Sequence, residues 1–448
     1  MNHNNIRVEI QCAHTYLCGH LNTKKSASDV ERSDSRWKRE IWDDKKYRTT
    51  CNIYYESFID SLVEVEGRKP QDFYKGTAHL TMEINTHCQL RHRRFGEIGW
   101  NFMVCSLHLF FFPYDICLFA IEISEDPGCD PDKLTFAHNL LRGVNEYYEP
   151  RPSDPESWSM YDNAPEYIKA ITPLLKICEV VDGERVVHVP RYADLTCTGN
   201  KLKAFQIFRV SDLSDEFLYE LGSMSPIGCV NNSKNNLSPS RDYFEHIMAN
   251  NTISAFRNWK ALALLDSLTV IRKDGECTDM KHWHDSYFRL IYIHAYYQKT
   301  LLFVVNNQFR SDVANGKCEN LLHQMKEQEH WYAFSNISYN FLPQMIYQAI
   351  DTGLEIASER EQLHHYLVQE AERQESLNER RLGKLLSILT ILTVLSALYD
   401  GTSLVSEILG ISSGSCPYRW IAAVLSGVVV LIFMWWIWSN YYKRRNRL

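Results

Sequence analysis

The sequence predicts an α/β domain that is followed by a long stalk helix and two C-terminal transmembrane helices, in a chain that works as a homo-oligomer. Three observations lead to this fold class. The first half of the chain alternates β-prone runs with amphipathic segments, and the stretch before residue 382 is helical without an obvious stop. The C-terminal part then holds two apolar runs that carry no charge, as membrane helices do.

Composition already excludes some classes of protein. The chain has 448 residues, of which 45% are hydrophobic and 12% aromatic, so intrinsic disorder is excluded and two or three folded units are expected. The net charge is −7, from 48 basic and 55 acidic residues, and it argues against direct nucleic-acid binding. The mean hydropathy of −0.33 is typical of a soluble protein. This average is misleading, because the apolar residues are concentrated at the C-terminal end.

Residues 1–235 are expected to form the α/β domain, which we place in the cytoplasm. Ser106–Ile123 holds two apolar runs around a Pro-Tyr-Asp turn, and this pattern predicts a β-hairpin. Asp130–Val144 begins with a capping Asp before an apolar stripe and predicts a helix. The turn-rich stretch Gly222–Ser240 supplies the domain boundary. Short strand candidates lie at 186–189 and 205–208.

Residues 236–381 are expected to be helical and to end in the stalk. Phe256–Ile271 and Asp285–Gln308 carry apolar residues at helical spacing, and a longer helix is predicted from about Asn340 into the membrane. Neither Gly nor Pro occurs between residues 354 and 382 to stop it. Its imperfect packing seam consists of Leu363, Leu367, Ala371, Gln374, Leu377 and Arg381.

Two transmembrane helices are predicted, at 382–399 and 420–438. The second stretch is free of charge, has Trp at both ends and has the length of about 20 residues that a bilayer core requires. The first holds fifteen uncharged residues, Leu385–Tyr399, and reaches spanning length when Leu382 and the aliphatic stem of Lys384 are included. A buried core helix is the alternative for both runs.

Basic residues set the orientation of this predicted helix pair. They precede the first helix and follow the second, in the tail 439–448, while the outer loop 400–419 holds one Arg. We therefore expect an inner (plasma) membrane protein, embedded in the lipid bilayer, with its N-terminal domain and its C-terminal tail in the cytoplasm. No apolar signal segment is evident at the N-terminus. With twelve of thirteen cysteines in a reducing compartment, no disulfide framework is expected.

This arrangement resembles the CorA-like two-helix magnesium transporter superfamily. Asn378-Glu379 is similar to the Asn-containing entry of that family's pore helix, and Thr393 lies six residues before Tyr399, as a pore-lining Thr does in the family. The closing YYKRRNRL is similar to the basic end of these proteins. Where the family has Tyr-Gly-Met-Asn, this chain has a degenerate signature without the Asn that holds hydrated magnesium: Tyr399, Asp400, Gly401 and Thr402.

The resemblance implies a homo-oligomer, a pentamer in this family, with Mg²⁺ or another divalent cation as the transported species. Degenerate members include zinc-transporter-like proteins and the CorA-like membrane effectors encoded beside type III CRISPR systems. In those effectors a nucleotide messenger is thought to act on the cytoplasmic domain. The lost Asn favours this branch, so we expect an ion channel of antiviral defence that a small nucleotide ligand gates. A magnesium transporter is the alternative, and a non-conducting, membrane-anchored binding scaffold is the second alternative.

Hydroxylated and acidic residues of the first apolar helix are the candidate pore lining: Thr390, Thr393, Ser396 and Asp400. The last three follow at i, i+3 and i+7 and lie near one line on a helix. In a ring of copies, the Asp400 carboxylates would concentrate cations at the outer mouth and bind a metal ion there. The alternative, which the sequence leaves open, is that the hydroxylated residues pack one helix against another.

A basic cluster in the cytoplasmic part is the candidate site for the ligand. Arginine suits phosphate because its planar fork donates two parallel hydrogen bonds, so a nucleotide or a phospholipid head group fits such a cluster. A solvated loop is the alternative interpretation. The candidate residues are Arg91, Arg93 and Arg94, with Arg142 and Arg151 as secondary members.

Cysteine and histidine also lie close together near the N-terminus, at Cys12, His14, Cys18 and His20. Residues i and i+2 share one face of a strand, so each Cys-x-His pair could converge on a zinc ion. The spacing differs from common zinc fingers, and ordinary strand residues are the alternative. The P-loop, nucleophile-elbow and metalloprotease-helix motifs are all absent from the sequence. We therefore expect a protein that is not an enzyme.

Overall fold

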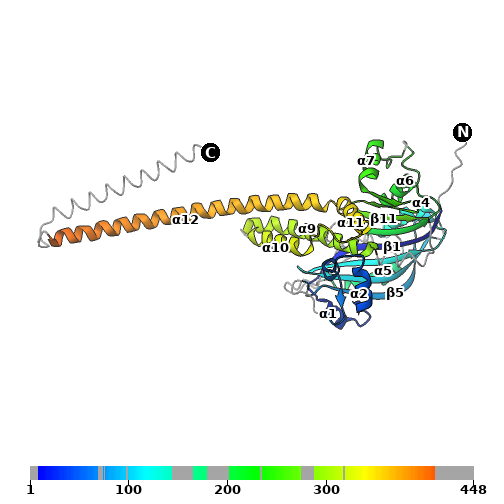
Figure 1. Cartoon of the computed structure of the whole chain (residues 1–448), viewed down its shortest axis with the longest axis horizontal. Coiled ribbons are helices and arrows are strands. Elements are labelled where there is room, and N and C mark those ends of the chain that lie inside the picture. The colour runs from blue at the N-terminus through cyan, green and yellow to red at the C-terminus, as the bar shows by residue number, and fades with distance from the viewer. Residues whose placement is uncertain are drawn as a thin grey trace, which may run out of the picture. The chain divides into compact units, whose positions relative to one another are not determined.

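The structure is a computed structural model that describes residues 9–68, 74, 76–96, 99–143, 165–178, 201–232, 235–273, 287–315 and 318–408. The chain divides into two compact units, Met1–Tyr366 and Leu367–Leu448. Helix α12 (Ile356–Ile408) begins in the first unit and continues in the second (Figure 1). Each unit is described by itself.

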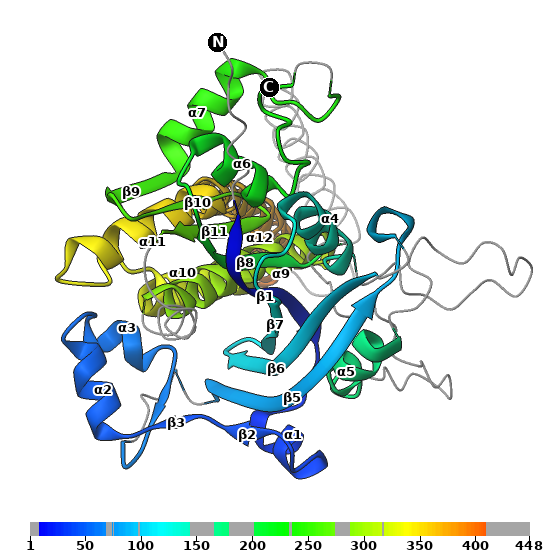
Figure 2. The ribbon, with the colours of Figure 1, turned by 90° about the vertical axis from the view of Figure 1, so that its right-hand side faces the viewer.

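A nine-stranded sheet organises the first unit, in the order β2-β5-β6-β7-β1-β8-β11-β10-β9. Its neighbours pair antiparallel, except for β8 and β11, which pair parallel. Figure 2 shows β5, β6 and β7 side by side. The strands are β1 (Ile10–Asn22), β2 (Lys38–Arg39), β5 (Ala78–Leu90), β6 (Trp100–Phe112), β7 (Ile116–Glu125), β8 (Lys203–Val210), β9 (Thr252–Phe256), β10 (Trp259–Ala263) and β11 (Ser267–Arg272). A separate parallel pair joins β3 (Ile41–Trp42) to β4 (Glu64–Val65).

Helices cover both faces of this sheet. On one face, Tyr167 of α5 lies 5.6 Å from Phe102 of β6 between ring centroids, and His138 of α4 lies 6.0 Å from Phe208 of β8. On the other face, Tyr292 and Tyr297 of α9 contact the rings of β8 and β6. The helices are α1 (Ala27–Ser33), α2 (Asp44–Cys51), α3 (Glu56–Asp60), α4 (Pro131–Leu141), α5 (Pro165–Leu175), α6 (Asp215–Ser223), α7 (Arg241–Asn251), α9 (Arg289–Asn315), α10 (Cys318–Tyr332) and α11 (Phe341–Gly353).

The predicted hairpin and the helix after it are confirmed. Strands β6 and β7 pair from Phe112 with Ile116 onward, and the turn places Tyr114 and Asp115 at positive φ, of 65° and 56°. Helix α4 begins where the sequence predicts, because the Asp130 side chain accepts a hydrogen bond from the Asp132 amide and caps the helix. The strand predicted at 205–208 lies within β8, whereas 186–189 lies outside the described residues.

The prediction of a helix at Phe256–Ile271 is wrong, because this segment holds the antiparallel pair β10 and β11. Both strands are buried on their two faces, so their apolar residues form a continuous run rather than an alternating one. A continuous apolar run does not distinguish a buried strand from a buried helix. A tight turn between Ala263 and Ser267, closed by hydrogen bonds between the backbones of Leu264 and Ser267, separates the two strands.

The stalk helix does not begin at Asn340, because a break separates α11 from α12. Helix α11 ends at Gly353, and Glu355 adopts a positive φ of 57° before α12 starts at Ile356. Gly353 also packs against β10: a Cβ atom at this position would lie 2.6 Å from the Ala263 carbonyl oxygen. The glycine is therefore required by close packing, and the chain turns immediately after it.

The predicted pair of membrane helices requires a correction. In the described part of the chain, none of the helices combines the length and the apolar character needed to cross a bilayer. Helix α12 runs through 382–399 and on to Ile408, into the stretch predicted as an outer loop. Its uncharged run, Leu385–Tyr399, is bounded by Lys384 and Asp400 and falls short of about 20 residues. The fold class with transmembrane helices and the inner-membrane location are thus not supported, and residues 409–448, which include 420–438, lie outside the described residues.

Candidate functional site

The predicted pore residues all lie on α12, and a single chain does not assemble them into a site. The hydroxyls of Thr390 and Thr393 donate to the carbonyls four residues earlier, at 2.7 and 2.8 Å, as hydroxylated residues inside helices often do. Ser396 and Asp400 are exposed farther along the same helix. Tyr399, Gly401 and Thr402 are helical residues of α12 and do not form a loop.

The predicted basic ligand site is not assembled as one cluster. Arg91 is exposed and donates to Gln89, and the exposed Arg94 guanidinium lies 4.5 Å above the Phe136 ring of α4. Arg142 is buried instead, donating from Nε to the Leu202 carbonyl at 2.5 Å and pairing with Asp266 at 3.3 Å. It therefore joins loops of the first unit. Arg93 belongs to a 3-10 turn, and Arg151 lies outside the described residues.

The four Cys and His residues of β1 do not form a metal site. Cys12 is disulfide-bonded, although the sequence led us to expect no disulfide framework. His14 Nε2 lies 3.0 Å from Glu122 Oε1, and burial of His20 lowers its pKa to about 4. Burial also raises the pKa of the Cys18 thiol, which keeps it protonated. The part of the chain that the structure describes contains no group of three His, Cys, Asp or Glu residues arranged to hold a metal ion.

The structure does bring together a set of polar side chains that sequence analysis missed. They cross four neighbouring strands on the sheet face toward α9, and we call them the buried polar row: His14 on β1, Glu122 on β7, Ser106 and His108 on β6, His79 on β5, and Glu40 beyond β2. His14 and Glu40, at its two ends, are partly buried, and the other four are buried. The only available signal was a polar residue within an otherwise apolar strand, as in the segments SLHLFF and FAIEI.

Glu122 is the centre of the first half of the row. Its Oε1 faces His14, and its Oε2 lies 3.3 Å from Nε2 of His108 and accepts from the Ser106 hydroxyl. Ser106 Oγ also lies 2.8 Å from His108 Nε2. Burial opposes ionisation of Glu122, but the hydrogen bonds and charges of His108 and His14 outweigh it and hold the pKa of this carboxyl below its ordinary value.

Glu40 closes the other end of the row. His79 connects to it, with Nε2 at 3.0 Å from His108 Nδ1 and with Nδ1 at 2.7 Å from Glu40 Oε2. Lys46 and Trp42 donate to the same carboxylate, and Arg289 of α9 lies 3.8 Å away. Burial lowers the pKa of His79 to about 3, so this imidazole is neutral near pH 7 and its proton lies on Nδ1, toward Glu40.

The order Ser106, His108, His79, Glu40 resembles a nucleophile, a base and the groups that orient it. The burial of these residues excludes the use of Ser106 as a nucleophile. Ser106 is 7% exposed and is also bonded to Glu122. The neighbouring cavity, lined by Trp42, His79 and Arg289 among others, has a volume of about 10 Å³, room for about one water molecule. The geometry suits a buried chain of proton-bearing groups and does not suit catalysis on a substrate.

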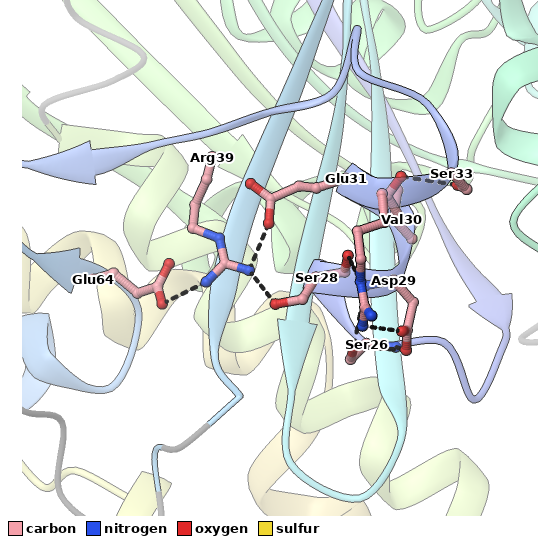
Figure 3. Close-up of polar contacts among 9 residues, drawn as sticks. Ser26, Ser28, Asp29, Val30, Glu31, Ser33, Arg39 and Glu64 are labelled. Carbon is pink, nitrogen blue, oxygen red and sulfur yellow. Dashed lines mark hydrogen bonds and ion pairs between the residues drawn. The ribbon is translucent and has the colours of Figure 1, made fainter.

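An ion-pair cluster holds the segment that carries Glu40 (Figure 3). The neighbouring Arg39 donates to Glu64 of β4 at 3.1 Å and to Glu31 and Ser28 of α1 at 2.8 and 3.1 Å. Ser26 caps α1, with its hydroxyl bonded to Asp29 and with the Asp29 carboxylate accepting from the Ser26 amide. Arg39 therefore links α1 to β4 beside the Glu40 end of the row.

Comparison with known proteins leaves the family open. No family model matches the chain, and no curated protein matches it. Among solved structures, the structure of the full-length CmaX protein is similar at 13% sequence identity and a TM-score of 0.19, and the match covers 58% of this chain and 92% of that chain. At this score the similarity is weak.

Proposed function

We propose that this chain is a non-enzymatic sensor that assembles as a homo-oligomer through α12 and responds to a small anionic ligand. The observation that carries the proposal is a set of large apolar side chains that α12 leaves exposed. Six of them are between 55% and 64% exposed: Leu382, Leu385, Leu386, Ile388, Leu389 and Leu392. Contiguous apolar surface of this kind marks an interaction site in a folded protein.

The spacing of these residues favours a second copy of α12 as the partner. Leu382, Leu385, Leu389 and Leu392 follow at intervals of three, four and three, the a and d pattern of a helical coiled coil. We call them the leucine seam. Ser396 and Asp400 continue the same face. In this proposal both are polar positions of the helix interface, and for Ser396 this is the packing alternative that the sequence left open.

Helix α9 provides a physical connection from the sheet to the start of α12. Its first residue, Arg289, lies beside Glu40 at the end of the buried polar row. Farther along, Lys299 pairs with Glu359 at 2.5 Å, and Gln298 accepts from Arg360. A change on the sheet face toward α9 would therefore act directly on the first turns of α12, as signalling from a sensor requires.

The ligand class rests on the resemblance and on two exposed guanidinium groups. Arg91 and Arg94 remain accessible between β5 and β6, and Arg94 lies over the Phe136 ring. Arginine and an aromatic face together suit the phosphate and the base of a nucleotide. A nucleotide messenger of antiviral defence is thus the proposed ligand. An ion path or magnesium transport is not part of the proposal, since each would need helices that cross a bilayer.

Oligomeric state tests the assembly. The full chain is measured by native mass spectrometry and light scattering, and the family resemblance predicts five copies. Leu385→Ser with Leu389→Ser should give monomers. Ile391→Ser with Val394→Ser, on the opposite side of the helix, is the matched control and should leave the assembly unchanged. Equal effects of the two double substitutions on the oligomeric state would contradict the proposed seam. Tight binding of the chain to vesicles in place of self-association would contradict it as well.

Calorimetry tests the ligand separately. Mono-, di- and cyclic nucleotides are titrated into the assembled full chain, and Arg91→Ala with Arg94→Ala should weaken binding at least tenfold. Arg241→Ala, an exposed arginine on α7, is the control. If the chain assembles but binds no nucleotide, the proposed homo-oligomer is supported and the proposed nucleotide ligand is contradicted.

A further inference from the structure

A second buried carboxylate–imidazole pair lies on the opposite face of the sheet from the buried polar row. Glu125 ends strand β7, and His138 belongs to α4. His138 Nε2 lies 2.5 Å from Glu125 Oε1, and the two side chains are 1% and 0% exposed, respectively. The distance is that of a short hydrogen bond between groups excluded from water.

Gln206 determines where the ring protons of His138 lie. The Gln206 amide nitrogen donates to the Leu221 carbonyl at 3.0 Å and to Thr269 Oγ1 at 2.7 Å. Only the nitrogen of the amide can donate to a carbonyl, so its oxygen is the atom that lies 2.9 Å from His138 Nδ1. That oxygen is an acceptor, and His138 Nδ1 therefore carries a proton.

Both ring nitrogens of His138 thus face acceptors. A neutral imidazole has one ring proton, and that proton is already directed at Gln206. A bare Nε2 against an ionised carboxylate would bring two lone pairs together, in a site too buried for water to relieve the repulsion. We propose that Glu125 and His138 form a proton-binding site, in which one additional proton is shared between Oε1 and Nε2.

The other groups around the pair are consistent with a shared proton. Among the described residues, Glu125 Oε2 is buried without a hydrogen-bond partner, and a full negative charge at such an oxygen would be costly. Phe208 of β8 stacks along the His138 ring. Within the part of the chain that the structure describes, Cys129 is a titratable neighbour; burial and the charges of Glu125, Asp130 and Asp126 raise its pKa to about 12, so it stays protonated. Thr269 and the Leu221 carbonyl supply no charge.

The site ties proton binding to the packing of two helices. His138 comes from α4, Leu221 belongs to α6, and both are held on the sheet through Gln206 and Glu125. In the unfolded chain a histidine loses its second proton above about pH 6.5 and a glutamate is already ionised. The folded chain then binds one more proton than the unfolded chain, so its stability falls as the pH rises above 6.5.

Urea unfolding of the full chain from pH 7 to pH 8.5 tests this proposal. Relative to Glu125→Gln, whose amide donates to Nε2 without an added proton, the unfolding equilibrium constant of the wild type should rise up to tenfold per pH unit. Ionisation of unfolded thiols contributes equally to both proteins and cancels in the comparison. Thr269→Val removes a neighbouring hydrogen bond and no proton, so it should lose stability with the wild-type pH dependence.

The same comparison decides against the proposal if Glu125→Gln and the wild type differ by a constant factor across this range. Should Glu125→Gln fail to fold, Glu125→Met replaces it, because an apolar side chain of similar volume also removes the need for the proton. A parallel pH dependence in wild type and Glu125→Met overturns the site, and a divergence that grows with pH supports it.

Discussion

The sheet unit and the second half of α12 distribute polarity in opposite ways. The sheet hides carboxylates and imidazoles between its strands and helices, each held by named partners, as in the buried polar row and the Glu125–His138 pair. Helix α12 instead presents leucines to its surroundings from Leu382 to Leu395. A buried charge is stabilised within one chain only by its partners, whereas an exposed apolar face is satisfied by another molecule. In the described residues, the carboxylates and imidazoles of the sheet are therefore paired within the chain, whereas α12 leaves an apolar face for another molecule.

Acidification should give the largest difference in stability between the first unit, which contains the sheet, and the second half of α12. Burial lowers the pKa of His79 and of His294 to about 3 and that of His20 to about 4. These rings stay neutral in the folded chain, while the unfolded chain takes up protons below about pH 6.5. The contribution of these three histidines to stability is therefore fully present above pH 6.5 and is lost as the pH falls. Each histidine contributes a loss of about 2 kcal/mol between pH 6.5 and pH 5.

Thermal unfolding as a function of pH checks this, with His294→Gln expected to lose part of the acid sensitivity. His246→Gln, at an exposed position on α7, serves as the control and should follow the wild-type curve. An unfolding temperature that stays constant from pH 6.5 to pH 5 would show that the buried histidines already carry protons.

Removal of a charge from the buried polar row should come next in size. Glu122→Ala leaves His108 and His14 without their acceptor and leaves a cavity, so we expect a loss of about 3 kcal/mol or more in the free energy of unfolding. Glu64→Ala removes one partner of the half-buried Arg39, which keeps Glu31 and Ser28, and should cost about 1 kcal/mol or less. Urea denaturation of both variants measures the difference, and equal losses would refute the contrast.

Two glycines extend the comparison to packing, and the first belongs to the sheet unit. In Gly353→Ala the new Cβ would lie 2.6 Å from the Ala263 carbonyl oxygen, and backbone cannot move aside as a flexible side chain can. We expect destabilisation by about 1–3 kcal/mol, measured by urea denaturation. A variant as stable as the wild type would mean that the contact between α11 and β10 is loose.

The second glycine, Gly383, lies within α12 and should give the smallest effect, with the opposite sign. A Cβ there meets no atom within 4 Å among the described residues, and alanine favours a helix over glycine by up to about 1 kcal/mol. Gly383→Ala should therefore raise the helix content or the unfolding temperature slightly, as followed by circular dichroism. A loss of stability would indicate a close neighbour at this position, such as a second helix.

Sequence analysis predicts local features of this fold well where one signal dominates. The Pro-Tyr-Asp turn gave the β6–β7 hairpin, and the capping Asp130 gave the start of α4. It failed at Phe256–Ile271, where apolar residues on both faces erase the strand period, and at Gly353, where the break depends on contact with Ala263. The break at Gly353 depends on a contact distant in sequence, and the burial of β10 and β11 on both faces depends on the elements that cover them.

The candidate site was harder to predict than the fold. Glu122 and His14 lie far apart in the chain, and only the register of β1 beside β7 brings them within 3.0 Å. Arginine composition was a poor guide, because burial turned Arg142 into a structural residue. The leucines of α12 were visible in the sequence, and their interpretation as a membrane helix required a correction because charged residues bound the run at Lys384 and Asp400.

The position of β1 has a consequence for how the protein is made. This strand is synthesised before both of its neighbours, because its Ala13 pairs with Glu125 on one side and with Phe208 on the other. Both edges of this central strand can be paired only after residue 210 has left the ribosome. Until then its apolar side chains are exposed. Closing such distant contacts is slow and invites aggregation. We expect a nascent chain of this protein to depend on chaperones until β8 has been synthesised.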